Sequence, residues 1–481
     1  MASPVPRSGI VVFSGGSAAN NLVDVFERLR EANGTTLSYV IPISDNGGST
    51  SEIIRVFGGP GEKSGLSEIH HHRIAASGIL ALLLTRKSPA PGIGDVRSRL
   101  VRLIPDGNTN NGPEIVAIKH FFNHRLAPSY DAARAEWLDM LDATHALWTD
   151  ISSPKRELIR SYLNCFNLEA IKRLRPSSRF DFSGASIGNL FLTGARLVTG
   201  SFEAAIYLLS SLCAVPDHIG VLPAINTNFA HHIAAGLQDD TVITGQNDIS
   251  HPSCPTAEEY DQIEDANLPG SLPALRRPAL AFSKAREDEE DLPSRIHRVW
   301  YINPYGQEIR IPANPRVMDA LQRATTIIYS IGSLFTSLIP NLVLRGVGDA
   351  IASPSIRQKV LLLNGTTDRE TGPSDDPLSA LDFVGAIATA CADSRGWPPP
   401  DENQYAVYVT HVIYLEGPSC PRVDKARLAE LGIETVRLYG PRDEHGRGGT
   451  YDATALAQAL ETIVGRKNGK ADPSRRNSFD G

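Results

Sequence analysis

The amino-acid sequence predicts an α/β fold, in which a mostly parallel sheet carries helices on both faces. Three segments repeat one pattern: a short run rich in β-branched residues, a glycine-containing turn, and then a segment with helical spacing of its apolar residues. Parallel strands must be joined by crossover connections, which are usually helices, so strands that alternate with helices indicate such a sheet. The three runs are residues 9–13, 37–43 and 326–329.

The other elements follow from the same criteria. A helix is expected over residues 20–31, directly after the first turn. Apolar residues at helical spacing predict a helical lobe over residues 131–174. The adjacent His231 and His232 are interpreted as a partly buried helical pair. Further strands are expected over residues 359–363, 406–409 and 434–438.

We expect one domain with insertions. It spans residues 1–465, is interrupted at about 62–90, 120–180 and 250–310, and is followed by a polar, disordered tail over residues 466–481. The dipeptide Pro60-Gly61 recurs as Pro91-Gly92, so the residues between them are either a tolerated loop or a translated intron.

Composition argues against some classes of partner. The chain of 481 residues has a net charge of -7 and a pI near 6.0, which argues against a general electrostatic grip on nucleic acid or on an anionic membrane. Five scattered cysteines are typical of reduced thiols, and the polar N-terminus resembles no signal peptide. We therefore expect a cytoplasmic protein, with a homodimer as a base-rate expectation for this fold class.

The first turn is a candidate phosphate site. Ser14, Gly15, Gly16 and Ser17 follow the first strand, where glycine lets the backbone approach a ligand closely. The helix that follows presents unpaired N–H groups and the positive end of its dipole, both suited to phosphate. The spacing matches neither a dinucleotide-binding fingerprint nor a Walker loop. A tight structural turn is the alternative.

The second turn adds a carboxylate. Asp45 follows the second strand, where it could hold a metal ion or orient a substrate hydroxyl. The neighbouring amides and hydroxyls could meet phosphate oxygens, and the alternative is an Asn-Gly turn that caps a helix. These neighbours are Asn46, Gly47, Gly48 and Ser49.

Two later segments supply further polar groups. Gly94 and Asp95 precede Arg97 and Arg99, and guanidinium groups suit bidentate phosphate contacts; a surface ion pair at a helix start is the alternative. After the strand at 326–329 the chain again has a glycine turn with hydroxyl and amide side chains that could contact a sugar or base. The candidate residues in this turn are Gly332, Ser333 and Asn341.

A hydrolase motif is also present. Gly184, Ser186 and Gly188 match the Gly-x-Ser-x-Gly nucleophile elbow, and Asp368 and His411 follow in hydrolase order. This pattern is short and common. We interpret Asn189, at the start of an apolar helix, as a polar ligand contact instead.

The order of these motifs resembles the 2-phospho-L-lactate transferase (CofD-like) family, and particularly its bacterial gluconeogenesis-factor branch. Each motif is modest alone, but their shared order is specific, and they span nearly the whole chain apart from the insertions. The matching segments are residues 10–17, 45–50, 91–95, 186–190, 221–224, 314–317 and 332–341.

The resemblance implies a Rossmann-like fold with one deep cleft. In the transferase branch, a phospholactyl group passes from a guanylyl diphospho-lactate to a deazaflavin hydroxyl with magnesium. In the gluconeogenesis-factor branch, the similar pocket is associated with UDP-sugar binding and control of carbon metabolism. By motif position, Asp45 would be the acceptor-side or metal-orienting carboxylate and Arg97 the cation near the acceptor or phosphate.

Two functions follow from this resemblance. The first is a magnesium-dependent transferase that acts on a GDP- or UDP-type donor. The second is a non-catalytic nucleotide-sugar-binding regulator. In both, residues 15–17 together with Gly332 and Ser333 would form the phosphate cradle.

Overall fold

The computed structural model describes residues 8–16, 18–44, 52–53, 56–57, 93–104, 112–173, 179–228, 231–250, 272, 291–442 and 449–465. The predicted tail, the insertion at 62–90 and most of the segment 250–290 lie outside these residues.

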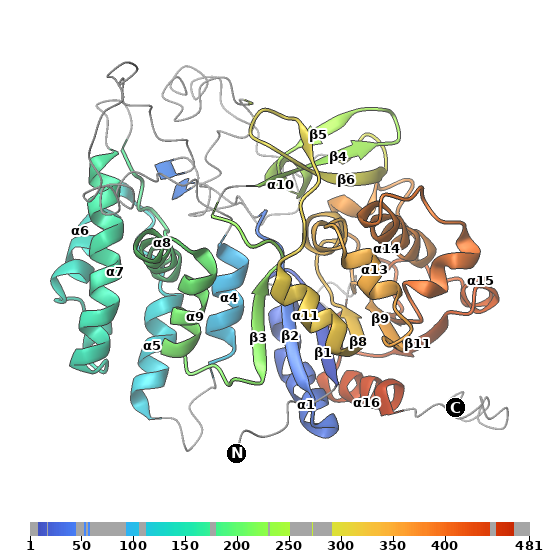
Figure 1. The fold of residues 1–481 in the computed structure, drawn as a ribbon, viewed down its shortest axis with the longest axis horizontal. Coiled ribbons are helices and arrows are strands. Elements are labelled where there is room, and N and C mark those ends of the chain that lie inside the picture. Colours follow the sequence, from blue (N-terminus) through green and yellow to red (C-terminus); the bar gives the residue numbers. More distant parts are fainter. Residues whose placement is uncertain are drawn as a thin grey trace, which may run out of the picture.

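A seven-stranded sheet forms the centre of the molecule, and all of its strand pairs are parallel. This confirms the predicted α/β class with a mostly parallel sheet. The order is β11–β10–β9–β8–β1–β2–β3 (Figure 1). The strands are β1 (Gly9–Phe13), β2 (Thr36–Ile41), β3 (Ile219–Pro223), β8 (Ala324–Tyr329), β9 (Gln358–Leu362), β10 (His411–Leu415) and β11 (Glu434–Leu438).

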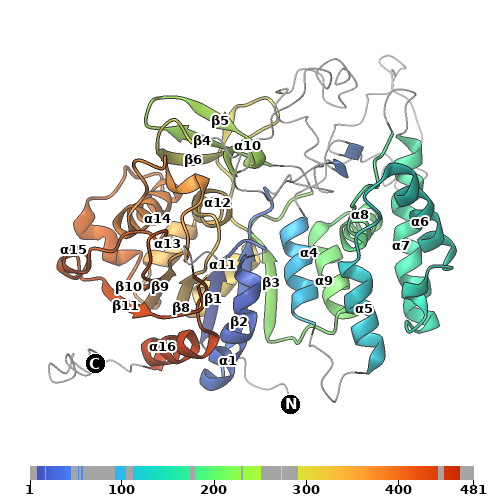
Figure 2. The same ribbon diagram turned by 180° about the vertical axis from the view of Figure 1, so that it is seen from behind.

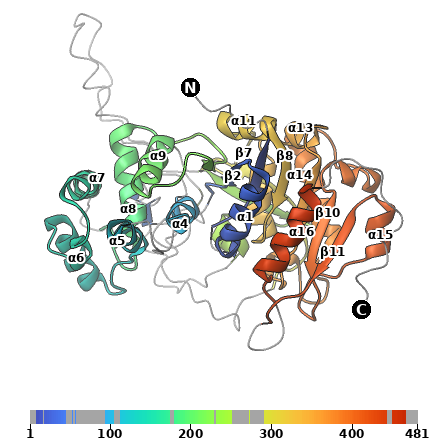
Figure 3. The same cartoon turned by 90° about the horizontal axis from the view of Figure 1, so that it is seen from below.

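Helices cover both faces of this sheet. The helices α1 (Val23–Asn33) and α16 (Ala453–Gly465) pack against each other on one face. The other face carries α11 (Pro315–Arg323), α13 (Val347–Ala352) and α14 (Ala380–Ser394) (Figure 3). Right-handed crossover connections explain why helices lie on both faces. The chain moves outward in opposite directions from β1 and from β8, so crossovers of the same hand lie on opposite faces of the sheet.

A helical lobe lies beyond the β3 edge of the sheet (Figures 1 and 2). Its core is aromatic, with the Trp137 ring stacked on Phe182 at 5.2 Å and edge-on to Phe166 at 5.8 Å. The lobe comprises α4 (Gly94–Arg102), α5 (Pro113–Asn123), α6 (Tyr130–Asp142), α7 (Ser153–Lys172), α8 (Ile187–Thr199) and α9 (Phe202–Leu212). The lobe predicted over residues 131–174 corresponds to α6 and α7.

A second, antiparallel sheet was not foreseen from the sequence. Its order is β5–β4–β6–β7, and it comprises β4 (His232–Leu237), β5 (Val242–Thr244), β6 (Ile296–Ile302) and β7 (Glu308–Ile309). The predicted helical pair of histidines is therefore wrong, because His232 starts β4. Burial lowers the pKa of His232 to about 4, so the ring is neutral in the sheet.

One predicted strand is displaced. Residues 406–409 do not form a strand, because the Val409 and Tyr408 N–H groups donate to the Tyr405 carbonyl and close the 3₁₀ turn of η8 (Glu402–Val407). The strand is β10, which begins at His411. Among the described helices, none combines the length and hydropathy needed to cross a bilayer.

Candidate functional site

The strand order reverses between β1 and β8, which lie side by side in the sheet. The chain proceeds from β1 toward β2 and β3 on one side, and from β8 toward β9, β10 and β11 on the other. At such a switch point the loops that leave the carboxyl ends of the two strands diverge, and ligands of open α/β sheets bind in the resulting crevice.

A cavity of about 240 Å³ occupies this crevice. The loops after β1 and β8 form two of its walls, and the others come from η1 (Ala18–Leu22), α4, α10 (Gln246–Ser250) and the π-helix η6 (Leu334–Leu338). The lining is small and polar, with one carboxylate among the described residues. It consists of Gly15, Gly16, Ala18, Ala19, Asp95, Gln246, Asn247, Ser250, Ile331, Gly332, Ser333, Thr336 and Ser337.

The glycines after β1 are required by close packing. A Cβ on Gly16 would lie 2.2 Å from Asp95 Oδ1 and 2.9 Å from Asp95 Cα. A Cβ on Gly15 would lie 2.6 Å from Ser337 Oγ. Any side chain here would therefore displace the start of α4 or protrude toward η6, which explains why the turn carries two glycines.

The loop after β8 is fixed by an amide clamp. The Gly332 N–H donates to Asn364 Oδ1 at 3.0 Å, and Asn364 Nδ2 donates to the Gly332 carbonyl at 2.9 Å. Gly332 has φ 142°, a left-handed conformation that favours glycine. Because both backbone groups of Gly332 are held, the following residue Ser333 enters η6 from a rigid turn.

Glu370 joins two walls of the cavity. It is 1% exposed and lies in η7 (Arg369–Thr371). Its carboxylate accepts hydrogen bonds from the N–H groups of Phe335 (2.9 Å) and Thr336 (3.0 Å). It also accepts from the hydroxyls of Thr336 (2.5 Å) and Ser250 (2.6 Å). One buried carboxylate thus fixes η6 relative to α10.

Arg99 is buried beneath the first loop rather than directed at a ligand. It is 0% exposed, and it donates to the carbonyls of Ala19 (3.1 Å) and Gly15 (3.2 Å) and to Ser14 Oγ (3.2 Å). Its guanidinium lies 4.6 Å from the centre of the Tyr39 ring. Burial lowers the pKa of Arg99 to about 10, so it stays protonated at neutral pH. The expected phosphate contact by Arg99 is therefore replaced by a structural role.

Arg97 faces the helical lobe. Its Nε donates to Asn189 Oδ1 at 3.3 Å, and its Nη1 donates to Asn123 Oδ1 at 3.2 Å. A Cβ on Gly188 would lie 2.7 Å from Arg97 Cγ, so the glycine allows α8 to approach the arginine. The structure therefore brings Arg97 and Asn189 together, as a group separate from the residues that line the cavity.

The remaining predicted residues divide into three sets. Gly94 begins α4 but does not line the cavity. Asn341 is 0% exposed and donates to the Ser337 carbonyl at 2.8 Å, so it supports η6 from within. The others lie outside the described residues, and their roles stay predictions: Ser17, Asp45, Asn46, Gly47, Gly48 and Ser49.

The hydrolase alternative does not fit the topology. His411 is the first residue of β10. It therefore lies at the amino ends of the parallel strands, opposite to the carboxyl ends where the cavity lies. Asp368 caps η7 by accepting the Thr371 N–H at 3.1 Å. Ser186 precedes α8 in the lobe. The three residues therefore do not form a catalytic triad.

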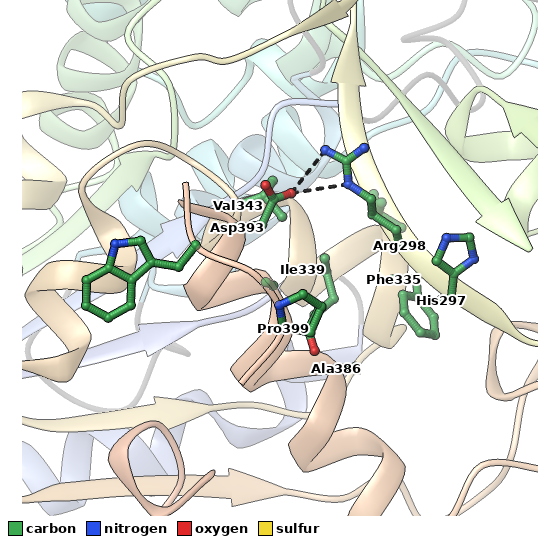
Figure 4. Close-up of a pocket in the computed structure, with 12 residues that line it drawn as sticks. His297, Arg298, Phe335, Ile339, Val343, Ala386, Asp393 and Pro399 are labelled. Atoms are coloured by element: carbon green, nitrogen blue, oxygen red, sulfur yellow. Dashed lines mark hydrogen bonds and ion pairs between the residues drawn. The ribbon is translucent and has the colours of Figure 1, made fainter. Parts of the chain in front are cut away.

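A second cavity of about 200 Å³ lies on the other side of η6 and is mostly apolar. In Figure 4, Phe335, Ile339, Val343 and Ala386 form its wall, while Arg298 and Asp393 pair with each other at its side. Because these charges are already paired, this cavity offers little for an anion. We therefore assign the candidate site to the polar cavity beyond β1 and β8.

Sequence reasoning missed Gln246, Asn247, Ser250 and Glu370. The first three reach the cavity through α10, which lies between strands β5 and β6 of the unforeseen second sheet. Gly245, with φ 94° at the end of β5, is a local turn signal there, but nothing local connects it to β1. Glu370 acts through contacts with residues far away in sequence.

Asp95 provides a test of the electrostatics of this cavity. Burial raises its pKa above the ordinary 3.8, against the opposing effects of the Gly16 N–H and of Arg99 and Arg97. Because the pKa of Asp95 is raised on folding, the carboxyl group holds its proton more tightly in the folded protein than in the unfolded chain. The folded state therefore loses stability as pH rises above about 3.8. We expect Asp95→Asn, which cannot ionise, to gain in Tm relative to the wild type between about pH 4 and pH 7. Measuring the Tm of both proteins across this pH range checks the prediction. A difference in Tm that stays constant with pH would contradict it.

Comparison with known proteins agrees with the fold and the motif order. The family model described as 2-phospho-L-lactate transferase CofD matches residues 78–437. The Saccharomyces cerevisiae protein YNL011C is 34% identical over 440 residues, covering 85% of this chain and 90% of that protein. The gluconeogenesis factor of Halalkalibacterium halodurans is 25% identical over 278 residues, covering 56% of this chain and 68% of that protein.

Solved structures agree with the fold. A crystal structure of a Bacillus halodurans protein of the UPF0052 family superposes with a TM-score of 0.53 at 19% identity, covering 96% of this chain and 100% of that one. The predicted resemblance is confirmed by the family model, whose match begins at residue 78, ahead of α4, ends within β11 and includes the β8 wall of the cavity. The chain therefore belongs to the 2-phospho-L-lactate transferase CofD family.

Proposed function

We propose that the protein binds a nucleoside-diphosphate-linked small molecule at the β1–β8 switch point and transfers its phosphoryl-linked group to an acceptor hydroxyl. The observation that carries this proposal is the polar cavity between the loops after β1 and β8. Its volume of about 240 Å³ suits the diphosphate portion of a ligand, leaving the base and the transferred group to extend outside it.

The lining supports phosphate and sugar recognition. Ser333, Thr336 and Ser337 provide hydroxyls, and Gln246 and Asn247 provide amides. Gly15 and Gly16 keep the wall thin, so backbone groups are accessible where a side chain would block them. Hydroxyls and amides can hydrogen-bond both phosphate oxygens and ribose hydroxyls, which makes a nucleotide-linked ligand the best fit.

Magnesium fits the donor set of this cavity. Asp95 contributes a carboxylate, and the neighbouring hydroxyl and amide oxygens are the hard ligands that Mg²⁺ prefers. Asp45, the residue expected to orient the metal, follows β2 in the sequence and lies outside the described residues. A bound magnesium ion would neutralise charge on a diphosphate.

Transfer of this kind depends on position and charge more than on a covalent nucleophile. The rigid turn at Gly332 and the Glu370 bonds hold the described walls in place. Arg97, held by Asn123 and Asn189 on the lobe side, is proposed as the cation near the acceptor or the transferred phosphoryl group. The lobe would then supply the acceptor half of the site.

The names of the relatives favour a second candidate function. Proteins of Halalkalibacterium halodurans and Bacillus subtilis that resemble this chain are called gluconeogenesis factors. On this alternative the protein binds a nucleotide sugar in the same cavity without turnover and regulates carbon metabolism. Both candidates require a diphosphate in the cavity, and only the first requires a product.

A ligand screen combined with one variant tests the shared claim. Gly15→Ala places a methyl group 2.6 Å from Ser337 Oγ and 3.0 Å from Ser337 Cβ, at the cavity wall, so the hydroxyl must rotate and η6 must shift slightly to accommodate it. We expect GDP-, UDP- or UDP-sugar ligands with Mg²⁺ to raise the Tm of the wild type, and Gly15→Ala to abolish most of that rise. Differential scanning fluorimetry measures both.

Gly112→Ala is the matched control, because nothing lies within 4 Å of the added Cβ on this exposed residue. A Tm rise that survives in Gly15→Ala would place the ligand elsewhere. Product analysis by mass spectrometry with an acceptor hydroxyl compound then separates transferase from regulator.

A further inference from the structure

Three potential metal ligands converge within the helical lobe, away from the cavity. His124 caps the C-terminus of α5, Glu136 lies in α6, and His145 precedes η2 (Ala146–Trp148). His124 Nε2 is 2.6 Å from Glu136 Oε1, and His145 Nε2 is 3.4 Å from the same oxygen. One ligand atom from each residue lies within 4.8 Å of the other two.

We propose that His124, Glu136 and His145 bind a zinc ion. Imidazole nitrogen and carboxylate oxygen are zinc ligands, and two histidines with one glutamate form a known three-ligand set that leaves a fourth position for water. Ligand atoms at about 2.0–2.1 Å from a tetrahedral zinc lie about 3.3 Å apart. The observed separations bracket that value, so small side-chain rotations suffice to form the site.

The surroundings orient these ligands. Glu136 Oε2 accepts the Ala127 N–H at 2.8 Å, which fixes the carboxylate and leaves Oε1 directed at the histidines. The Glu136 carboxylate is therefore an oxygen donor held in position for a divalent cation.

The site is accessible to an ion. The side chains of His124, Glu136 and His145 are 28%, 19% and 22% exposed. His145 Nδ1 accepts the Leu147 N–H at 3.2 Å, which places the proton of the neutral ring on Nε2. A zinc ion at Nε2 would take the place of that proton, which would move to Nδ1, and the partly buried ring would exchange its hydrogen bond from Leu147 for one to water.

The position of the metal gives it a structural consequence. The His124 carbonyl accepts the Ile187 N–H at 3.1 Å at the start of α8, and the Leu126 N–H donates to Ala185 at 2.9 Å. Asn123, next to His124, holds Arg97. A zinc ion here would fix the junction of α5, α6 and α8 that positions Arg97, although the metal site itself stands independently of the proposed function.

The test is zinc titration of chelator-treated full-length protein by isothermal calorimetry. The background variant carries His70→Gln, His71→Gln and His72→Gln, because adjacent histidines bind metal ions without a built site. We expect one equivalent of Zn²⁺ to bind this background. Adding His124→Gln or Glu136→Gln should lower the affinity at least about 100-fold, since each removes a direct ligand.

His120→Gln on the exposed side of α5 is the matched control and should leave the affinity unchanged. Should His124→Gln fail to fold, judged by far-UV circular dichroism, His145→Gln leaves the His124–Glu136 bond intact and serves instead. A parallel titration with Co²⁺, followed by its d–d absorption, should report nitrogen and oxygen ligation in the background variant. The ligand variants should lose this absorption. No zinc uptake by the background, or uptake unaffected by the ligand variants, would overturn the proposal.

Discussion

Glu370→Ala should lower the free energy of unfolding by about 3–5 kcal/mol and abolish ligand binding in the β1–β8 cavity. The substitution leaves the N–H groups of Phe335 and Thr336 and the Thr336 hydroxyl without their acceptor, and leaves the Ser250 hydroxyl only its 3.1 Å bond to Thr336 Oγ1. Each buried donor left unpaired costs about 1–3 kcal/mol, reduced here by the water or small shifts that the new space allows.

The loss of ligand binding follows from the position of these donors. Thr336 and Ser250 both line the cavity, and once the carboxylate is gone η6 and α10 keep only the single bond between the Ser250 and Thr336 hydroxyls at 3.1 Å. Glu370→Gln retains one acceptor oxygen and places an amide donor against the others, so we expect an intermediate loss of stability.

Urea denaturation followed by circular dichroism, together with the ligand-induced Tm rise, measures these effects. Glu430→Ala is the control, because its side chain is 65% exposed and pairs with Arg427 on the surface. Such a pair contributes less than about 1 kcal/mol. If Glu370→Ala and Glu430→Ala have the same urea midpoint, Glu370 does not fix the walls of the cavity.

The central part of the site could be predicted from sequence because it depends on a rule of parallel sheets. Gly15 and Gly332 are far apart in the chain, but each follows a buried strand, and the carboxyl ends of parallel strands lie at one edge. The adjacency of β1 and β8 itself could not be predicted, because it depends on the order in which strands insert into the sheet.

The walls supplied by α10 and Glu370 illustrate what local patterns miss. The Ser250 hydroxyl donates to Glu370 Oε1 at 2.6 Å, although no pattern in the sequence around either residue indicates this contact. Only the tertiary fold, in which α10 packs against η6 and η7, brings them together. The same limit explains the displaced strand at 406–409, where an apolar run continues into β10 and periodicity cannot locate its start.

Arg97 and Arg99 show how similar residues separate into different roles. Arg97 and Arg99 are two positions apart on α4, a rotation of about 200° around the helix axis. Their side chains therefore face nearly opposite sides of the helix and cannot face the same ligand. Arg99 lies under the first loop, and Arg97 lies against α8. The sequence predicted two guanidiniums for one phosphate; helix geometry allows at most one of them that role, and we propose it only for Arg97.

The final prediction concerns Arg97. We expect Arg97→Ala to weaken binding of the diphosphate ligand by about 1.5–3 kcal/mol, or roughly 10- to 150-fold, because it removes a charged hydrogen-bond donor. Arg97→Lys should recover only part of this affinity, since a lysine ammonium cannot reproduce the planar fork that Asn123 and Asn189 orient.

Arg102→Ala is the matched control on the same helix. Its guanidinium pairs at 2.7 Å with Asp24, whose side chain is 76% exposed, so its loss should leave the affinity unchanged. Calorimetric titration with the ligand found in the screen measures all three variants. Equal affinities for Arg97→Ala and the wild type would restrict Arg97 to holding α4 against α8. The transferase proposal would then need another cation near the acceptor, whereas a regulator that binds through the cavity alone would remain consistent with the structure.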